Sequence, residues 1–371
     1  MPEYSHYKKM KIEKILRPSV LNQPQYVAGK PIEYVAREFG LDAKDILKMA
    51  SNENPLGPSP KAIAAVKESL DSLNYYPDGG CYELCQKLSK QWNLKPTQFV
   101  FGNGSNEVLE LVAHAFLEKG CNAIMGKYSF IVYKLSTMLM DAECREIDMP
   151  NLAYDLNKLL EAIDDNTRVV FIANPCNPTG TVLSQKDLEA FIEKLPEHVV
   201  LCYDEAYAEY ETNPVDLRPM IAKGKKVICA RTFSKIYGLA GLRVGYAYTT
   251  EEIAANLNKV KEPFNVNSLA QVGAMAALDD IDFVNASRNT NKEGMEFLSK
   301  EFKKLNLEYI AQGANFVMVK VKNALEIFDK LQKIGIIVRP NVGYGLPDWL
   351  RITIGRREEN IRFIEEFKKL V

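Results

Sequence analysis

The sequence has little of what marks several large classes of protein. Its 371 residues include only three histidines, and lysine plus arginine (47) almost balance aspartate plus glutamate (48). No apolar run approaches the roughly 20 residues needed to cross a bilayer, and residues 1–10 lack the apolar core of a secretory signal. A balanced charge provides no general attraction to nucleic acid or to an anionic membrane. We therefore expect a cytoplasmic protein with neither nucleic acid nor membrane as a partner.

The scarcity of histidine and the scatter of the seven cysteines also limit the chemistry. Cys81 and Cys85 lie four residues apart on a probable helix and could together hold a metal. With His6, His114 and His198 as the only histidines, further ligands are scarce, so we expect reduced thiols and no metal site. The same scarcity argues against Ser-His-Asp and Cys-His catalysis. Proton transfer is expected to depend on another type of residue.

The length and the order of the expected elements indicate two domains. A chain of 371 residues exceeds the size at which one core usually keeps growing. From residue 98, buried strands alternate with short loops and amphipathic helices, as in the strand 168–173 and the helix that follows Ser184. This alternation predicts an α/β domain with a mostly parallel, doubly wound sheet. From about residue 265 strands become fewer, which predicts a smaller α+β domain.

The stretch Arg-Thr-Phe-Ser-Lys-Ile-Tyr-Gly-Leu-Ala-Gly-Leu-Arg-Val-Gly at 231–245 has the strongest chemical character. It follows a short apolar strand and is rich in small residues, so the backbone can bend closely around a ligand. The Lys235 amine could form a Schiff base with a carbonyl cofactor, while Ser234 and Arg243 could hold its phosphate. The alternative interpretation is a surface lysine at the end of an ordinary strand.

Further polar residues follow other expected strands, always just beyond the carboxyl end. Because the carboxyl ends of parallel strands meet at one edge of an open α/β sheet, these side chains should converge there. The residues are Ser105 and Asn106, Tyr128, Asn177, Asp204 and Tyr207, and Ser234 and Lys235.

Three motifs together resemble one family. The 231–245 stretch, Asn-Glu-Asn-Pro-Leu-Gly-Pro-Ser at 52–59 and Asn-Pro-Cys-Asn-Pro-Thr-Gly at 174–180 look like those of fold-type I pyridoxal-phosphate aminotransferases, most closely the histidinol-phosphate aminotransferase family. Ile236 departs from the family, which usually has a small residue there. The resemblance implies a large cofactor-binding domain at 51–264, a small domain made of 1–50 with 265–371, and a homodimer that shares its active sites.

The resemblance also implies roles around pyridoxal phosphate. Asp204 would pair with the pyridine nitrogen, Asn177 and Tyr207 would donate hydrogen bonds to the ring oxygen, and Tyr128 would stack on the ring. Lys235 would hold the cofactor and then move the α-proton, which explains a site without histidine. The phosphate would be bound by Ser105, Asn106, Ser234 and Arg243, and by Tyr76 of the neighbouring subunit.

Two arginines are the expected determinants of substrate choice. By resemblance, Arg351 would take the α-carboxylate of glutamate, and Arg339, helped by Tyr26, the distal phosphate or γ-carboxylate; Asn54 is a further candidate. Both arginines could instead lie on the surface of ordinary strands. The expected reaction converts L-histidinol phosphate and 2-oxoglutarate to imidazole-acetol phosphate and L-glutamate. The alternatives are an aromatic-amino-acid aminotransferase and, more distantly, a phosphothreonine decarboxylase or a non-catalytic cofactor-binding module.

Overall fold

The structure, a computed structural model, describes residues 11–25 and 29–371. Its centre is a seven-stranded sheet in the order β2-β8-β7-β6-β5-β3-β4. Only β8 runs antiparallel to its neighbours, so the other six strands share one direction. The strands are β2 (Phe99–Gly102), β3 (Asn122–Gly126), β4 (Glu143–Ile147), β5 (Thr167–Ala173), β6 (Val200–Asp204), β7 (Val227–Thr232) and β8 (Gly245–Tyr248).

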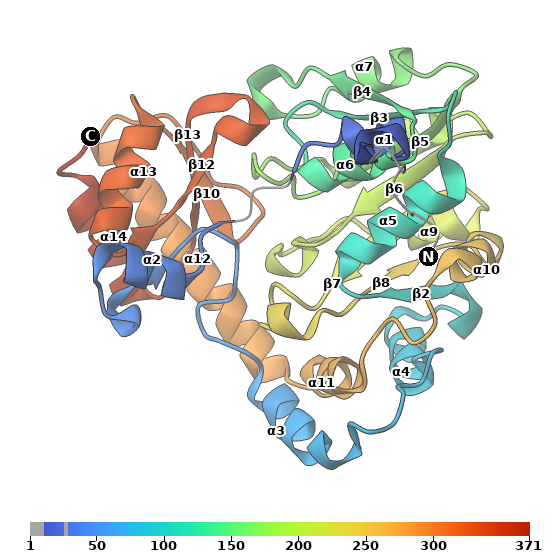
Figure 1. Cartoon of the computed structure of the whole chain (residues 1–371), viewed down its shortest axis with the longest axis horizontal. Coiled ribbons are helices and arrows are strands. Elements are labelled where there is room, and N and C mark those ends of the chain that lie inside the picture. The colour runs from blue at the N-terminus through green and yellow to red at the C-terminus, as the bar shows by residue number, and fades with distance from the viewer. Residues whose placement is uncertain (1–10, 26–28) are drawn as a thin grey trace, which may run out of the picture.

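Helices cover both faces of this sheet (Figure 1). Alternate residues of β5 point to opposite sides: Val170 and Ile172 belong to one apolar core, and Val169 and Phe171 to the other. The expected doubly wound α/β fold is therefore confirmed. The covering helices are α3 (Pro60–Glu68), α4 (Tyr82–Trp92), α5 (Ser105–Phe116), α6 (Ile131–Leu139), α7 (Leu156–Glu161), α8 (Gln185–Lys194), α9 (Arg218–Ala222), α10 (Glu251–Val260) and α11 (Ser268–Leu278).

A second, smaller unit has its own antiparallel sheet, in the order β12-β13-β10-β9. A short parallel pair, β1 with β11, joins the N-terminal part of the chain to this unit. The strands are β1 (Leu47–Lys48), β9 (Tyr309–Ile310), β10 (Phe316–Lys320), β11 (Ile336–Ile337), β12 (Arg339–Asn341) and β13 (Leu346–Thr353), and the helices are α2 (Ile32–Phe39), α12 (Ile281–Lys304), α13 (Ala324–Lys333) and α14 (Arg357–Phe367). This is the α+β composition expected from the sequence.

Several contacts favour a division between the two units other than the one expected from the sequence. Helix α11 packs against α3 and contributes to the core of the large sheet, although it lies beyond residue 264. Helix α12 passes from one unit to the other, with Val284 in the large core and Phe302 in the small one. The N-terminal α1 (Pro18–Leu21) contacts α6 of the large unit. We propose that the division falls within α12, and that residues 18–21 lie with the large domain.

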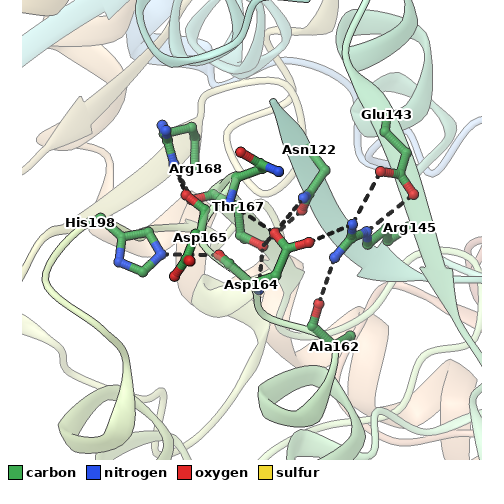
Figure 2. Close-up of polar contacts among 10 residues, drawn as sticks. Asn122, Glu143, Arg145, Ala162, Asp164, Asp165, Thr167, Arg168 and His198 are labelled. Carbon is green, nitrogen blue, oxygen red and sulfur yellow. Dashed lines mark hydrogen bonds and ion pairs between the residues drawn. The ribbon is translucent and has the colours of Figure 1, made fainter. Parts of the chain in front are cut away.

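The amino ends and the carboxyl ends of the strands in the large sheet have different contacts. At the amino ends of β3, β4 and β5, the Asp164 carboxylate accepts hydrogen bonds from Asn122 (2.8 Å) and pairs with Arg145 (2.7 Å) (Figure 2). The backbone carbonyl of Asp164 also lies 3.1 Å from Nε2 of His198. These contacts hold the amino ends of the strands together, at the opposite end of the strands from their carboxyl ends. Among the described helices, none is both long and apolar enough to cross a membrane.

Candidate active site

A cavity of about 310 Å³ lies at the carboxyl ends of β6 and β7, between the large sheet and the small domain. It brings together the polar groups that follow separate strands, as the sequence predicts for this edge. Ten of the expected site residues line it: Ser105, Asn106, Asn177, Asp204, Tyr207, Ser234, Lys235, Arg243, Arg339 and Arg351. Tyr76, Tyr128 and Asn54 do not line it, and Tyr26 lies outside the described residues.

Lys235 occupies the loop after β7, and its side chain is half-buried at the cavity. The Nζ atom donates a hydrogen bond to the carbonyl oxygen of Ser51 (3.2 Å) and lies 5.6 Å from the centre of the Tyr207 ring. Burial lowers the pKa of Lys235 to about 8, and the charge of Arg351 acts in the same direction. At pH 7 about a tenth of the amine is therefore unprotonated, the form that both a nucleophile and a base require.

Asp204 ends β6 and presents a buried carboxylate to the cavity. Its Oδ2 accepts a hydrogen bond from the Tyr133 hydroxyl (2.8 Å), and its Oδ1 accepts one from the backbone N–H of Ala206 (3.1 Å). Desolvation raises the pKa of Asp204 to about 6, although these two donors oppose the shift. A positive group beside this carboxylate would favour its charged form. The site is therefore suited to a protonated ring nitrogen.

Asn177 and Tyr207 lie on another wall of the cavity. The Asn177 Oδ1 accepts a hydrogen bond from Nη1 of Arg351, so the amide N–H₂ remains as the donor. The Tyr207 hydroxyl oxygen accepts a hydrogen bond from Nδ2 of Asn52 (2.8 Å). Burial raises the pKa of Tyr207, so its hydroxyl stays protonated. Both side chains can thus donate to an oxygen anion.

The start of α5 and the loop after β7 form an anion cradle. Gly104 precedes the helix with φ 82°, and the first backbone N–H groups of a helix have no partner within it. A Cβ on Gly245 would lie 2.3 Å from the backbone nitrogen of Ser105, so a glycine is needed for this close approach. The Ser234 hydroxyl lies beside this helix start in the same cavity.

Arg243 completes the cradle in a left-handed backbone conformation, with φ 57°. This conformation costs an L-residue about 1–2 kcal/mol, and such strain is typical of functional sites. The guanidinium bonds to the Asn103 carbonyl (3.2 Å), and its Nη1 is 3.5 Å from Oγ of Ser234. It therefore connects the loops after β2 and β7 at the place where a phosphate would be held.

Phe130 is one of three aromatic residues that line the cavity, with Tyr207 and Tyr344. Tyr128, the expected stacking residue, is partly buried against a separate apolar cluster with Leu346 and Trp349. Phe130 lines the cavity and packs edge-on against Tyr133, with the ring centres 5.8 Å apart. We therefore propose Phe130, rather than Tyr128, as the ring that stacks on a flat ligand.

Arg339 and Arg351 reach the cavity from neighbouring strands of the small domain. They are cross-strand partners in the pairing of β12 with β13. Two guanidinium groups on one face of a sheet can together bind an anionic ligand. The Arg351 guanidinium also donates to the Ala50 carbonyl oxygen (2.8 Å).

Asn54 and Tyr76 are placed differently from the substrate and cofactor groups. The Asn54 amide N–H₂ donates to the Ile236 carbonyl and to Oγ of Ser287, each at 2.8 Å, so it holds the loop after Lys235. We propose a structural role for it. Tyr76 is 83% exposed and stacks on Phe264, with the ring centres 4.8 Å apart.

The described residues offer no metal site. No cluster of three or more histidine, cysteine, aspartate or glutamate side chains is suited to a metal ion in this part of the chain. Cys81 and Cys85 are buried, and all seven cysteines are free thiols. Burial raises the pKa of Cys81 to about 12.

The donor set fits pyridoxal phosphate. A helix start with Ser234 and Arg243 suits its phosphate, a buried carboxylate suits its pyridine nitrogen, and an amine of lowered pKa suits its carbonyl carbon. Two residues at the site were not expected from the sequence: Tyr133, which contacts Asp204, and Asn52, which contacts Tyr207. Tyr133 lies on α6 three positions after Phe130, and Asn52 begins the Asn-Glu-Asn motif, so both lie in stretches with a recognisable sequence signal.

Comparison with known proteins agrees with this geometry. The model of the family "Aminotransferase class I and II" matches residues 44–367, and the chain belongs to this family. It is 44% identical over 363 residues to a histidinol-phosphate aminotransferase of Akkermansia muciniphila, covering 98% of this chain and 100% of the relative. A histidinol-phosphate aminotransferase of Caldicellulosiruptor saccharolyticus is 45% identical over 349 residues, covering 93% and 97%.

Solved structures give the same result. The histidinol-phosphate aminotransferase of Sinorhizobium meliloti, solved in complex with pyridoxal-5'-phosphate, superposes with a TM-score of 0.86 at 25% identity and covers 100% of both chains. Aspartate aminotransferase of Thermus thermophilus has a TM-score of 0.83 at 20% identity, covering 96% of this chain and 99% of that one, and shares the fold. The expected family, fold type and pyridoxal-phosphate-dependent aminotransferase activity are confirmed.

Proposed function

We propose that this aminotransferase converts L-histidinol phosphate and 2-oxoglutarate to imidazole-acetol phosphate and L-glutamate, in histidine biosynthesis. The observation that carries the proposal is the cross-strand pair Arg339 and Arg351, which line the same cavity as Lys235. One pocket then offers two cationic side chains, one from each of two neighbouring strands. Histidinol phosphate has a distal phosphate and no carboxylate, whereas glutamate has two carboxylates. Both substrates can use such a pair.

The chain's own groups would hold the cofactor as follows. The helix start at Ser105 and Asn106, with Ser234 and Arg243, would bind the phosphate. Asp204 would pair with the pyridine nitrogen. The ring oxygen would receive hydrogen bonds from Asn177 and Tyr207, and Phe130 would cover one face of the ring.

Pyridoxal phosphate and the side chains of the protein would contribute different parts of the chemistry. Pyridoxal phosphate supplies a carbonyl that condenses with amines and a ring that withdraws electrons from the neighbouring carbon. Asp204 would keep the positive charge at the ring nitrogen. Lys235 Nζ would hold the cofactor in the resting enzyme. Once released, this amine would take the proton from the amine-bearing carbon of the amino donor, and it would supply a proton to the corresponding carbon of the oxo acid in the second half of the reaction. A pKa of about 8 leaves this amine able to accept a proton near neutral pH.

The rival substrates differ in what the distal arginine does. An aromatic amino acid has no distal anion, so in an aromatic aminotransferase Arg339 would serve only the γ-carboxylate of the glutamate partner. A phosphothreonine decarboxylase would have to remove the carboxylate that Arg351 is placed to hold. A non-catalytic module would have no use for an amine of lowered pKa beside a buried carboxylate such as Lys235 with Asp204.

Steady-state kinetics of two arginine variants test the substrate assignment. Losing a bidentate arginine–phosphate pair costs about 2–4 kcal/mol, or roughly 30- to 1,000-fold in kcat/KM. Arg339→Leu should therefore cripple turnover of histidinol phosphate, weaken glutamate less and leave phenylalanine unchanged. Arg351→Leu should instead impair glutamate and phenylalanine. Arg362→Leu, an exposed arginine outside the cavity, is the matched control.

The assignment of Arg339 is wrong if Arg339→Leu keeps the kcat/KM for histidinol phosphate within about threefold of wild type. A variant that retains the binding of cofactor and the turnover of phenylalanine shows that the loss is specific to the distal anion.

We further propose a homodimer in the cytoplasm, whose active sites are completed across the interface. Tyr76 supports this, because its ring is 83% exposed beside Phe264 and outside the cavity of its own chain. Tyr75, Leu73 and Leu70 are exposed on the same segment. A second copy packed there would bury these apolar side chains and could bring Tyr76 to its partner's phosphate cradle.

A further inference from the structure

The hydroxyl of Tyr207 is oriented by a residue outside the expected set. Asn52 lines the cavity, is 1% exposed and has a left-handed backbone, with φ 56°, which asparagine tolerates better than most residues. Its Nδ2 donates to the Tyr207 hydroxyl oxygen at 2.8 Å. Since that oxygen already accepts a hydrogen bond from Asn52, the tyrosine's own proton must be directed elsewhere.

The orientation of the Asn52 amide is fixed in turn by Thr353. The threonine Oγ1 accepts the backbone N–H of Asn52 (2.9 Å) and donates to Oδ1 of Asn52 (3.1 Å). With the single proton of the hydroxyl given to Oδ1, the Nδ2 of Asn52 faces Tyr207. The Asn52 carbonyl accepts a third bond, from Nδ2 of Asn315 (3.0 Å). The asparagine is thus held on every polar group.

Residues of the small domain position both the ring and the hydroxyl of Tyr207. Its ring packs edge-on against Phe316 of β10, with the ring centres 5.4 Å apart at 83°. Its hydroxyl is reached from Thr353 of β13 through Asn52. Phe316 and Thr353 are themselves opposed partners in the pairing of β10 with β13. One cross-strand pair of the small sheet therefore sets the position of a side chain that follows β6 of the large sheet.

We propose that Asn52 and Thr353 are positioning residues that direct the Tyr207 proton into the cavity, towards the ring oxygen of the cofactor, and so couple the seating of the small domain to the cofactor's charge. The inference rests on the cofactor-binding role proposed above for Tyr207. A donor on the ring oxygen stabilises its anionic form. An asparagine N–H on the tyrosine oxygen makes that donor stronger, because linked hydrogen bonds polarise one another.

The test is the pH midpoint of the visible absorbance change of the protein loaded with pyridoxal phosphate, read without substrate. Losing a donor to the ring oxygen raises this midpoint. Asn52→Gly, which keeps the left-handed backbone, and Thr353→Val should each raise it by about 0.5–1 pH unit. Thr353→Ser should restore the wild-type midpoint. Circular dichroism reports whether each variant is folded. If Asn52→Gly does not fold, the comparison of Thr353→Val with Thr353→Ser still tests the inference.

Repeating both substitutions in a Tyr207→Phe background makes the test specific. Tyr207→Phe alone should raise the midpoint, and Asn52→Gly or Thr353→Val should then add no further shift, because they act only through the hydroxyl. The inference is overturned if Tyr207→Phe moves the midpoint but Asn52→Gly and Thr353→Val leave it in place. It is also overturned if these two substitutions shift the midpoint in the Tyr207→Phe background as much as they do in the wild type. If wild-type protein binds no cofactor, the proposed function fails as well.

Discussion

Removing one hydroxyl should shift the ionisation of Asp204 and with it the pH dependence of cofactor binding. Tyr133 is fully buried, donates to Oδ2 of Asp204 at 2.8 Å, and is stacked on Phe171 with the ring centres 4.9 Å apart. Tyr133→Phe keeps this stacking and deletes the donor. A hydrogen bond to a charged group is worth about 1.5–3 kcal/mol, which corresponds to about 1–2 pKa units.

The pKa of Asp204, about 6 with the hydroxyl present, should therefore rise to about 7–8 in Tyr133→Phe. At pH 7 the carboxylate would fall from about 90% ionised to between about 50% and 10%. If the ionised form is the one that holds the ring nitrogen, the Kd for pyridoxal phosphate should rise about two- to tenfold at pH 7 and more at pH 6. At pH 9 both proteins should bind equally.

Absorbance or fluorescence titration with pyridoxal phosphate from pH 6 to 9 measures this. Titration of the cofactor itself is common to both proteins and cancels in the ratio of their Kd values. Tyr246→Phe is the matched control, because that buried hydroxyl accepts a hydrogen bond from Trp92 (2.9 Å) instead of serving Asp204. A Kd ratio that stays the same at every pH would refute the reasoning, since a packing defect alone would not follow the ionisation of a carboxylate.

Two further predictions concern the dimer and the far edge of the sheet. Mixing Tyr76→Phe with Lys235→Ala should form hybrid dimers with one intact site, so activity should rise above that of either parent; proven subunit exchange without a rise would place Tyr76 outside its partner's site. Contacts with Asn122 and Arg145 hold the pKa of Asp164 well below its usual range, so its stabilisation is present above the ordinary aspartate pKa and lost as pH falls towards the folded value. Denaturant unfolding should show that Asp164→Asn is less stable than wild type at pH 7 and that the two free energies of unfolding converge at low pH. The exposed control Asp165→Asn should stay close to wild type throughout. An equal difference in the free energy of unfolding between Asp164→Asn and wild type at pH 7 and at low pH would contradict this.

Local patterns were sufficient to predict the fold and most of the cavity. The alternation of strand and helix predicted the parallel sheet, and the rule that ligands bind where such strands end placed Asp204 and Lys235 together without any coordinates. The antiparallel β8 was not predicted, because its residues Gly245–Tyr248 follow the lysine loop as a short apolar run with no signal of direction.

What the sequence could not supply are contacts between distant segments. The pairing of Arg339 with Arg351 depends on strand register, and the Asn52–Tyr207 bond joins residues 155 positions apart. The sequence also does not decide between Tyr128 and Phe130 as the stacking ring: both aromatics lie just after β3, and nothing local says which of them the turn directs into the cavity. The division proposed within α12 could not be predicted, because an apolar helix such as α11 gives no indication of which core it joins.

The most direct test of the central claim is a single half-reaction. Protein loaded with pyridoxal phosphate is mixed with one amino donor at a time, and the cofactor's absorbance is followed through one turnover. The proposed function predicts a fast change with L-histidinol phosphate that 2-oxoglutarate reverses, a change with L-glutamate, and a much slower one with L-phenylalanine. A faster change with phenylalanine than with histidinol phosphate, or none with histidinol phosphate, would contradict it.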